Sequence, residues 1–110
     1  MKKLIFVLLA IAVCVTAAAA PKAKKRIKVA CVGNSITFGL TLADPETQSY
    51  PSQLAEMLGA EYEVDNFGKS GATLLNRGHR PYMQQEEFKK ALEFAGDIAV
   101  IHLGINDTAP

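Results

Sequence analysis

The feature that most constrains the fold of this chain is a nearly unbroken apolar run at residues 98–103, which His102 alone interrupts and Gly104 follows. Such a run is typical of a central parallel strand, because helices cover both faces of a parallel sheet and bury the side chains of its inner strands. Residues 98–103 therefore predict a parallel sheet with helices on both sides, and a third strand that is buried on both faces.

Two further strands and two helices are expected before this run. Residues 27–32 are apolar and partly β-branched and stop at Gly33, whereas residues 62–67 alternate apolar with polar side chains, as a half-buried or edge strand does. Helices are expected at 53–58, after Pro51 and closed by Gly59, and at 86–95, closed by Gly96; segments 34–48 and 68–84 are loop-like. One face of the second helix carries Phe88, Ala91, Leu92 and Ala95.

This alternation predicts an α/β protein with a flavodoxin-like, three-layer α/β/α arrangement around a parallel sheet. About three strands and two to three helices leave much of such a sheet uncovered, so we expect an incomplete domain that further strand–helix units would complete.

The first residues have the pattern of an export signal. Lys2 and Lys3 precede an apolar stretch, small residues occupy 16–20, and cleavage is expected after Ala19. The alternatives are an uncleaved membrane anchor and lipid attachment at Cys14, where Val13 replaces the small residue that such a site needs. We expect a signal peptide at 1–20, a basic linker at 21–26, and a periplasmic or secreted protein without stable membrane association after cleavage.

Composition argues against several classes of function. The net charge of +1 gives no basic excess for nucleic acid, and no nucleic-acid motif is present. After signal cleavage Cys31 is the only cysteine, so no internal disulfide is expected, and it fits a small buried strand residue. The two histidines and Cys31 lack the spacing of metal ligands, so we expect neither a metal nor a cofactor.

Small polar residues follow each expected strand. These clusters lie at 33–37, 66–73 and 104–107. Ligands bind beyond the carboxyl ends of strands in open α/β sheets, so we expect the clusters to gather at one edge. A serine, glycine backbone and an asparagine amide are the parts of an acyl-transfer site, in which the serine attacks and N–H groups hold the oxyanion.

These clusters resemble the conserved blocks of the SGNH (GDSL-like) hydrolase family. Gly33-Asn34-Ser35 is similar to its first block, usually Gly-Asp-Ser, and Gly71 matches the glycine of its second. Gly104-Ile105-Asn106-Asp107 matches the Gly-x-Asn-Asp of its third block. The resemblance covers residues 27–108 and identifies 27–110 as the N-terminal part of such a hydrolase domain.

The resemblance implies a role for each matching residue. Ser35 would be the nucleophile, and its own N–H, the Gly71 N–H and the Asn106 amide would form the oxyanion hole. Gly33, Asn34, Gly104 and Asp107 would support the site, with Asp107 bracing its loop. Asn34 departs from the usual aspartate.

The general base of the family comes from an Asp-x-x-His block near its C-terminus, which these 110 residues do not contain. His102 lies in the apolar run and His79 in a loop, so both are poor substitutes. Losing the base of a serine triad costs on the order of 10⁶ in turnover, so we expect the chain as written to be nearly inactive.

Within the family, the chain is most similar to exported carbohydrate esterases of the sialate O-acetylesterase type, which implies an acylated small molecule or carbohydrate as substrate. Arg77, His79 and Arg80 are candidate substrate contacts, because arginines bind carboxylates in bidentate fashion. Two alternatives stay open: a flavodoxin-like module that binds phosphate or flavin on residues 33–39, and a truncated, non-catalytic remnant.

Overall fold

The computed structural model describes residues 24–108, so the expected signal peptide and the first half of the basic linker lie outside it. Its elements are β1 (Ile27–Gly33), α1 (Ser35–Phe38), α2 (Pro45–Gln48), α3 (Tyr50–Leu58), β2 (Tyr62–Gly68), η1 (Tyr82–Gln84), α4 (Glu86–Phe94), β3 (Ile98–His102) and η2 (Ile105–Thr108). The expected strands and helices are therefore present, and the loop at 34–48 contains the short helices α1 and α2.

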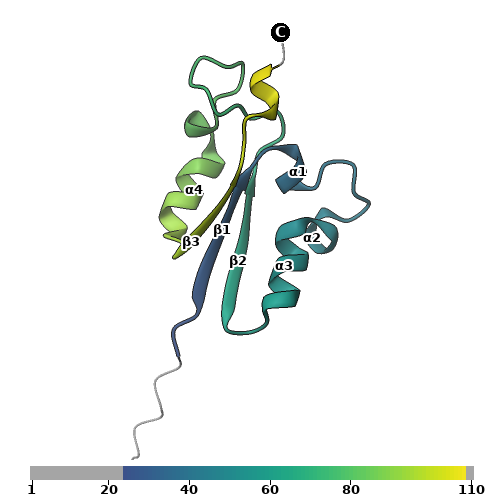
Figure 1. Ribbon diagram of the computed structural model, residues 1–110, viewed down its shortest axis with the longest axis vertical. Helices are drawn as coiled ribbons and strands as arrows, with labels where there is room; N and C mark the ends of the chain where they lie inside the picture. Colours follow the sequence, from purple (N-terminus) through teal and green to yellow (C-terminus); the bar gives the residue numbers. More distant parts are fainter. Residues whose placement is uncertain (1–23, 109–110) are drawn as a thin grey trace, which may run out of the picture.

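The three strands form one parallel sheet in the order β2-β1-β3. In the register, Gly33 at the end of β1 pairs with Gly68 on one side and with His102 on the other. All three strands therefore end at the same level, and the segments that follow them leave the sheet along one edge, at the top of Figure 1.

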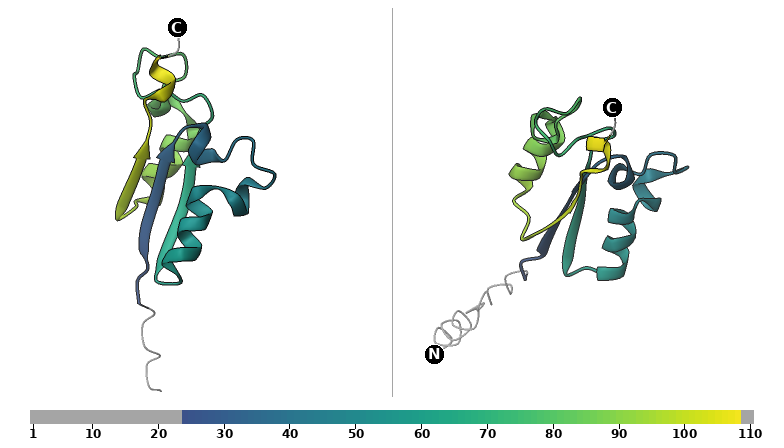
Figure 2. Two further views of the ribbon diagram at one scale, coloured as in Figure 1. Left: turned by 45° about the vertical axis from the view of Figure 1, so that its right-hand side comes forward. Right: turned by 45° about the horizontal axis from the view of Figure 1, so that its top comes forward.

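Helices lie on both faces of this sheet. Figures 1 and 2 show α4 on one side and α2 and α3 on the other, with α1 at the strand ends. The apolar core consists of Val29, Ala30, Cys31, Phe67, Ala72 and Tyr82. The predicted α/β fold with a parallel sheet is confirmed.

Two details of the prediction are wrong for the described residues. β3 lies at an edge of the three-stranded sheet rather than at its centre, and all five of its residues are exposed. It pairs with β1 on one side only, so its apolar side chains have few neighbours. α4 ends at Phe94, one residue before the predicted end, and its left-handed cap is Ala95, at φ 52°, instead of Gly96.

The apolar face of α4 is also less buried than its pattern predicts. No residue of α4 is fully buried, and Leu92 is 63% exposed. This face and β3 line an open apolar hollow of about 410 Å³. Among residues 24–108, none of the helices has the length and apolar character to cross a membrane.

Candidate active site at the strand ends

The turn after β1 presents Ser35 on a tightly fixed backbone. Gly33 has no room for a side chain, because a Cβ would overlap Thr37 and lie 2.9 Å from the His102 carbonyl oxygen. Asn34 is fully buried and caps α1, its Oδ1 accepting from the Ile36 N–H at 3.1 Å. Ser35 is thus the first residue of α1 and remains half-buried.

The loop after β2 is held against this turn. The Lys69 N–H donates to the Gly33 carbonyl oxygen at 2.9 Å. The Asn66 amide donates to the Thr37 carbonyl oxygen at 2.7 Å and accepts from the Gly68 N–H at 2.9 Å. A side chain at Gly68 would collide with the backbone of α1, so glycine is required for this close approach.

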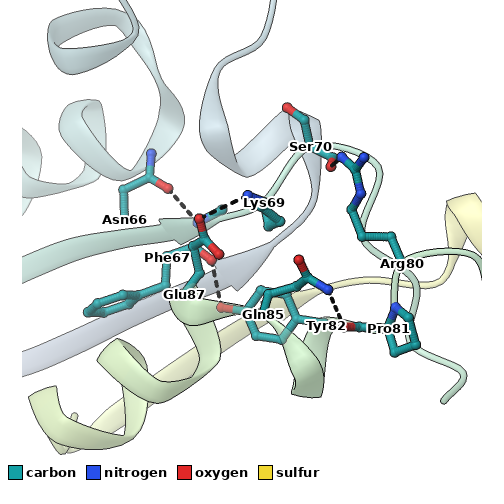
Figure 3. A network of polar contacts seen from close by, with 10 residues as sticks. Asn66, Phe67, Lys69, Ser70, Arg80, Pro81, Tyr82, Gln85 and Glu87 are labelled. Carbon is teal, nitrogen blue, oxygen red and sulfur yellow. Dashed lines mark hydrogen bonds and ion pairs between the residues drawn. The ribbon is translucent and has the colours of Figure 1, made fainter.

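Gly71 lies in a tight turn within that loop. Its φ of +78° is in the left-handed region, and the Ala72 N–H donates to the Lys69 carbonyl oxygen at 3.1 Å. The guanidinium of Arg80 donates to the Ser70 carbonyl oxygen at 2.8 Å, a contact that Figure 3 shows.

The loop after β3 is bonded to the same segment. The Asn106 Nδ2 donates to the Ala72 carbonyl oxygen at 2.9 Å, which places this amide one residue from Gly71. The Asp107 carboxylate accepts from the N–H groups of Leu74 and Leu75 at 2.8 and 2.7 Å. Gly104 has a φ of +116°, a conformation that few other residues adopt. The third loop is therefore fastened to the second by side chain–backbone bonds.

The three strand-end clusters thus meet at one edge of the sheet, and this edge retains free donors. Within residues 24–108, the N–H groups of Ser35 and Gly71 donate no hydrogen bond. The Asn106 amide uses one of its two hydrogens on Ala72 and keeps the other. Free N–H donors of this kind can bind an oxygen that gains negative charge during acyl transfer.

Tyr82 anchors the base of the second loop to β2. It is 2% exposed, and its hydroxyl donates to the Phe67 carbonyl oxygen at 2.6 Å (Figure 3). Burial raises the pKa of this phenol, and the nearby Glu87 raises that pKa further, so the hydroxyl stays protonated and keeps donating. Lys69 and Glu87 form an ion pair at 3.4 Å beside it.

Sequence reasoning missed the polar interior behind the site. Thr37 and Thr73 are fully buried. The Thr37 hydroxyl is 3.0 Å from the Tyr50 hydroxyl, and Thr73 exchanges backbone hydrogen bonds with residues 80 and 82. Both threonines belong to the predicted polar clusters at 33–37 and 66–73, but no local pattern marks them as buried, because their partners lie in other segments of the chain.

The remaining predicted residues lie away from these contacts. Arg77 and His79 are exposed in the loop, and His102 is exposed at the end of β3 rather than in the core. Cys31 is buried as predicted, and burial raises the pKa of its thiol, with Asp65 adding to the effect. In the part of the chain that the structure describes, no three His, Cys, Asp or Glu residues are placed to hold a metal ion.

Comparison with known proteins places this site in context. Residues 31–110 match the GDSL-like Lipase/Acylhydrolase family. A protein of Xylanibacter ruminicola named acetylxylan esterase is 48% identical over 91 residues, which are 83% of this chain and 19% of that protein. The chain therefore spans about a fifth of the length of this relative. No solved structure matches the chain.

Proposed function

Because this chain belongs to the GDSL-like lipase/acylhydrolase family, we propose that it carries the nucleophile and the oxyanion hole of an enzyme that removes O-acetyl groups from carbohydrate. The observation that carries the proposal is the fastening of three strand-end loops into one unit in which two backbone N–H groups stay free. Members of the family are carboxylic ester hydrolases, and such free donors are what ester hydrolysis requires.

In the proposed reaction, the Ser35 oxygen attacks the carbonyl carbon of the acetyl ester and loses its proton to a base. The carbonyl oxygen becomes an oxyanion and is bound by the N–H groups of Ser35 and Gly71 and by the free hydrogen of the Asn106 amide. The bond to the sugar oxygen then breaks, and the sugar leaves as an alcohol with a proton from the base. Water releases acetate from the serine in the second half of the reaction.

The base of this reaction is expected outside the described residues. Within 24–108, neither His79 nor His102 forms a hydrogen bond with Ser35. The family resemblance assigns the base to an Asp-x-x-His block, and we propose that the gene product needs such a block for full activity. Reading the coding sequence beyond residue 110 tests this directly, since the proposal requires an Asp-x-x-His there.

The substrate class rests on the acetylxylan esterase of Xylanibacter ruminicola. We propose an acetylated plant polysaccharide as the first substrate to test, with O-acetylated sialic acid as the second because of the motif resemblance. Arg77, His79 and Arg80 stay candidates for contacts with the sugar. We also propose that residues 1–20 are a signal peptide that directs export, which fits a polymer substrate outside the cell. Fractionation of expressing cells tests the periplasmic or secreted location.

The decisive assay uses the full-length gene product and its Ser35→Ala variant. Acetate release from acetylated xylo-oligosaccharides is measured beside release from O-acetylated sialic acid and from p-nitrophenyl esters of increasing acyl length. Ser35→Ala is expected to lower kcat by on the order of 10⁶, because no other group replaces the nucleophile. A variant as active as the parent enzyme would refute the proposal, and preference for long acyl chains would refute the carbohydrate assignment.

The flavodoxin-like alternative has less support from the turn after β1. The N–H groups of Ile36, Phe38 and Gly39 already donate to Asn34 or Ser35 oxygens, so they cannot cradle a phosphate in this conformation. An absorbance spectrum of the purified protein near 450 nm checks whether flavin is present.

A further inference from the structure

The peptide between Ser70 and Gly71 is held from one side by Arg80. The guanidinium donates to the carbonyl oxygen of this peptide at 2.8 Å (Figure 3), and the described residues contain no cis peptide. In a trans peptide the C=O and N–H point in opposite directions. Arg80 therefore binds the carbonyl end of the same peptide group whose N–H end is the proposed oxyanion donor.

A four-residue turn closed by a hydrogen bond between its end residues can be of type I or type II. Residues 69–72 are closed by the hydrogen bond from the Ala72 N–H to the Lys69 carbonyl oxygen, and Gly71 at the third position has φ +78°. With Ser70 outside the positive-φ region, this is a type II turn. A type I turn keeps the same closing bond but rotates the central peptide by roughly 180°, which would reverse the Gly71 N–H.

We propose that Arg80 is a positioning residue that selects the type II form and thereby directs the Gly71 N–H toward the acyl oxygen of the substrate. The inference rests on the proposed function of Ser35 and Gly71. In the type I form the Ser70 carbonyl would point away from the guanidinium, and the hydrogen bond at 2.8 Å would be lost. A charged donor makes this bond stronger than one between neutral groups, and a guanidinium stays charged at every pH in ordinary use.

The side chain of Arg80 is itself well placed for this task. A Cβ on Gly71 would lie 3.3 Å from its Nη1 and 3.7 Å from its Cζ, so the guanidinium packs directly on the glycine. The backbone beneath it is fixed, because the Thr73 N–H donates to the Arg80 carbonyl oxygen at 2.8 Å and the Tyr82 N–H donates to the Thr73 carbonyl oxygen at 2.9 Å. Thr73 is fully buried, so this attachment is rigid.

Positioning predicts a distinctive kinetic effect. An arginine that bound the sugar would lower affinity when removed, whereas one that orients an oxyanion donor acts in the transition state and lowers kcat. Losing an oxyanion donor costs roughly 10²–10³ in turnover, and a donor that is misdirected in most but not all molecules should cost less, about 10- to 100-fold.

The test compares Arg80→Ala with Arg26→Ala in the full-length gene product. Arg26 is a matched control, because its guanidinium also donates to a backbone carbonyl oxygen, that of Tyr62 at 2.7 Å, at the opposite end of the sheet. Arg80→Ala is expected to lower kcat about 10- to 100-fold with KM changed less than about twofold, and Arg26→Ala to leave both unchanged. Arg80→Lys should recover part of kcat, and added guanidinium should restore activity to Arg80→Ala alone.

A second readout does not depend on activity. In the ¹⁵N-labelled chain, the Gly71 amide resonance should move and its hydrogen exchange should change in Arg80→Ala, and stay in place in Arg26→Ala. A raised KM with unchanged kcat would overturn the proposal in favour of a sugar contact, and an unmoved Gly71 resonance would overturn it as well. If Ser35→Ala retained full activity the proposed function would fail, whereas the Gly71 resonance would still decide whether Arg80 selects the turn. Melting temperatures of all variants identify any that do not fold.

Discussion

Two regions of the molecule are held together by opposite kinds of interaction. One is the rim where the strands end, formed by residues 33–37, 66–73 and 104–107, and the other is the flank formed by β3 and α4. At the rim, several of the buried side chains are polar, and Asn34, Thr37 and Thr73 are all fully buried. On the flank, apolar side chains are exposed, with Leu92 at 63% and Ile101 at 65%. Hydrogen bonds to backbone atoms therefore hold the rim, while the flank contributes little apolar burial among the described residues. Substitutions at the rim should change activity most, and those on the flank should change stability little.

After the loss expected for Ser35→Ala, the largest expected effect tests the oxyanion amide of the rim. Asn106→Ala in the full-length gene product should lower kcat by roughly 10²–10³, because it removes a donor and frees the Ala72 carbonyl from the bond at 2.9 Å. Thr108→Ala is the control, since its hydroxyl bonds only within the same short helix, to the Ile105 carbonyl oxygen. Equal kcat values for the two variants would show that the rim does not act as an oxyanion hole.

The next effect concerns the brace between the second and third loops. Asp107→Ala should lower kcat roughly tenfold, because two backbone bonds at 2.8 and 2.7 Å no longer hold the Asn106 loop in place. Asp107→Asn keeps one acceptor oxygen, so its kcat should lie between those of the parent and of Asp107→Ala. Steady-state kinetics of the three proteins check this order. A larger loss of kcat in Asp107→Asn than in Asp107→Ala would contradict the proposal that this carboxylate holds the Asn106 loop in place.

A smaller effect, on stability, is expected from the anchor of the rim. Tyr82→Phe leaves the Phe67 carbonyl oxygen without its donor at 2.6 Å and should lower the free energy of unfolding by about 1–3 kcal/mol at neutral pH. Because the folded pKa of Tyr82 is raised, its contribution is complete below the unfolded pKa of about 10 and is lost as pH rises above that value.

Urea unfolding of the parent and of Tyr82→Phe between pH 7 and pH 11 measures this contribution. The stability difference between the two proteins should shrink above pH 10. A difference that stays constant up to pH 11 would show that Tyr82 titrates alike in the folded and unfolded states.

The smallest expected effect is on the flank, where Ile101→Thr should change the unfolding free energy of the 110-residue chain by less than about 0.5 kcal/mol. Val29→Thr in β1 is the matched comparison. Val29 is 3% exposed, so a buried hydroxyl there should cost about 1–3 kcal/mol. The same pair of variants in the full-length gene product sharpens the comparison. A large decrease in the free energy of unfolding for Ile101→Thr would mean that further residues cover this flank there.

Local patterns in the sequence were sufficient for the three strands, for the two longer helices and for the edge where the polar clusters meet. The apolar, partly β-branched run located β1 and the apolar–polar alternation located β2, and Gly59, at φ 81°, closes α3 as predicted. The cap of α4 was predicted one residue late, because Ala95 adopts the left-handed conformation that glycine usually takes. The apolar run of β3 was read as buried on both faces, since a side chain's apolar character does not reveal whether a neighbour covers it.

By itself, then, the sequence determined that this chain forms a parallel α/β sheet whose strands are followed by segments that carry serine, glycine and asparagine, because periodicity and turn residues act over a few neighbours. Only the tertiary structure decided how those ends are joined. The bonds from Asn106 to Ala72, from Asp107 to Leu74 and from Arg80 to Ser70 link residues 34, 33 and 10 positions apart. The first two depend on where the sheet register places two different loops, and the third on how the second loop folds back on itself, so no local pattern contains that information.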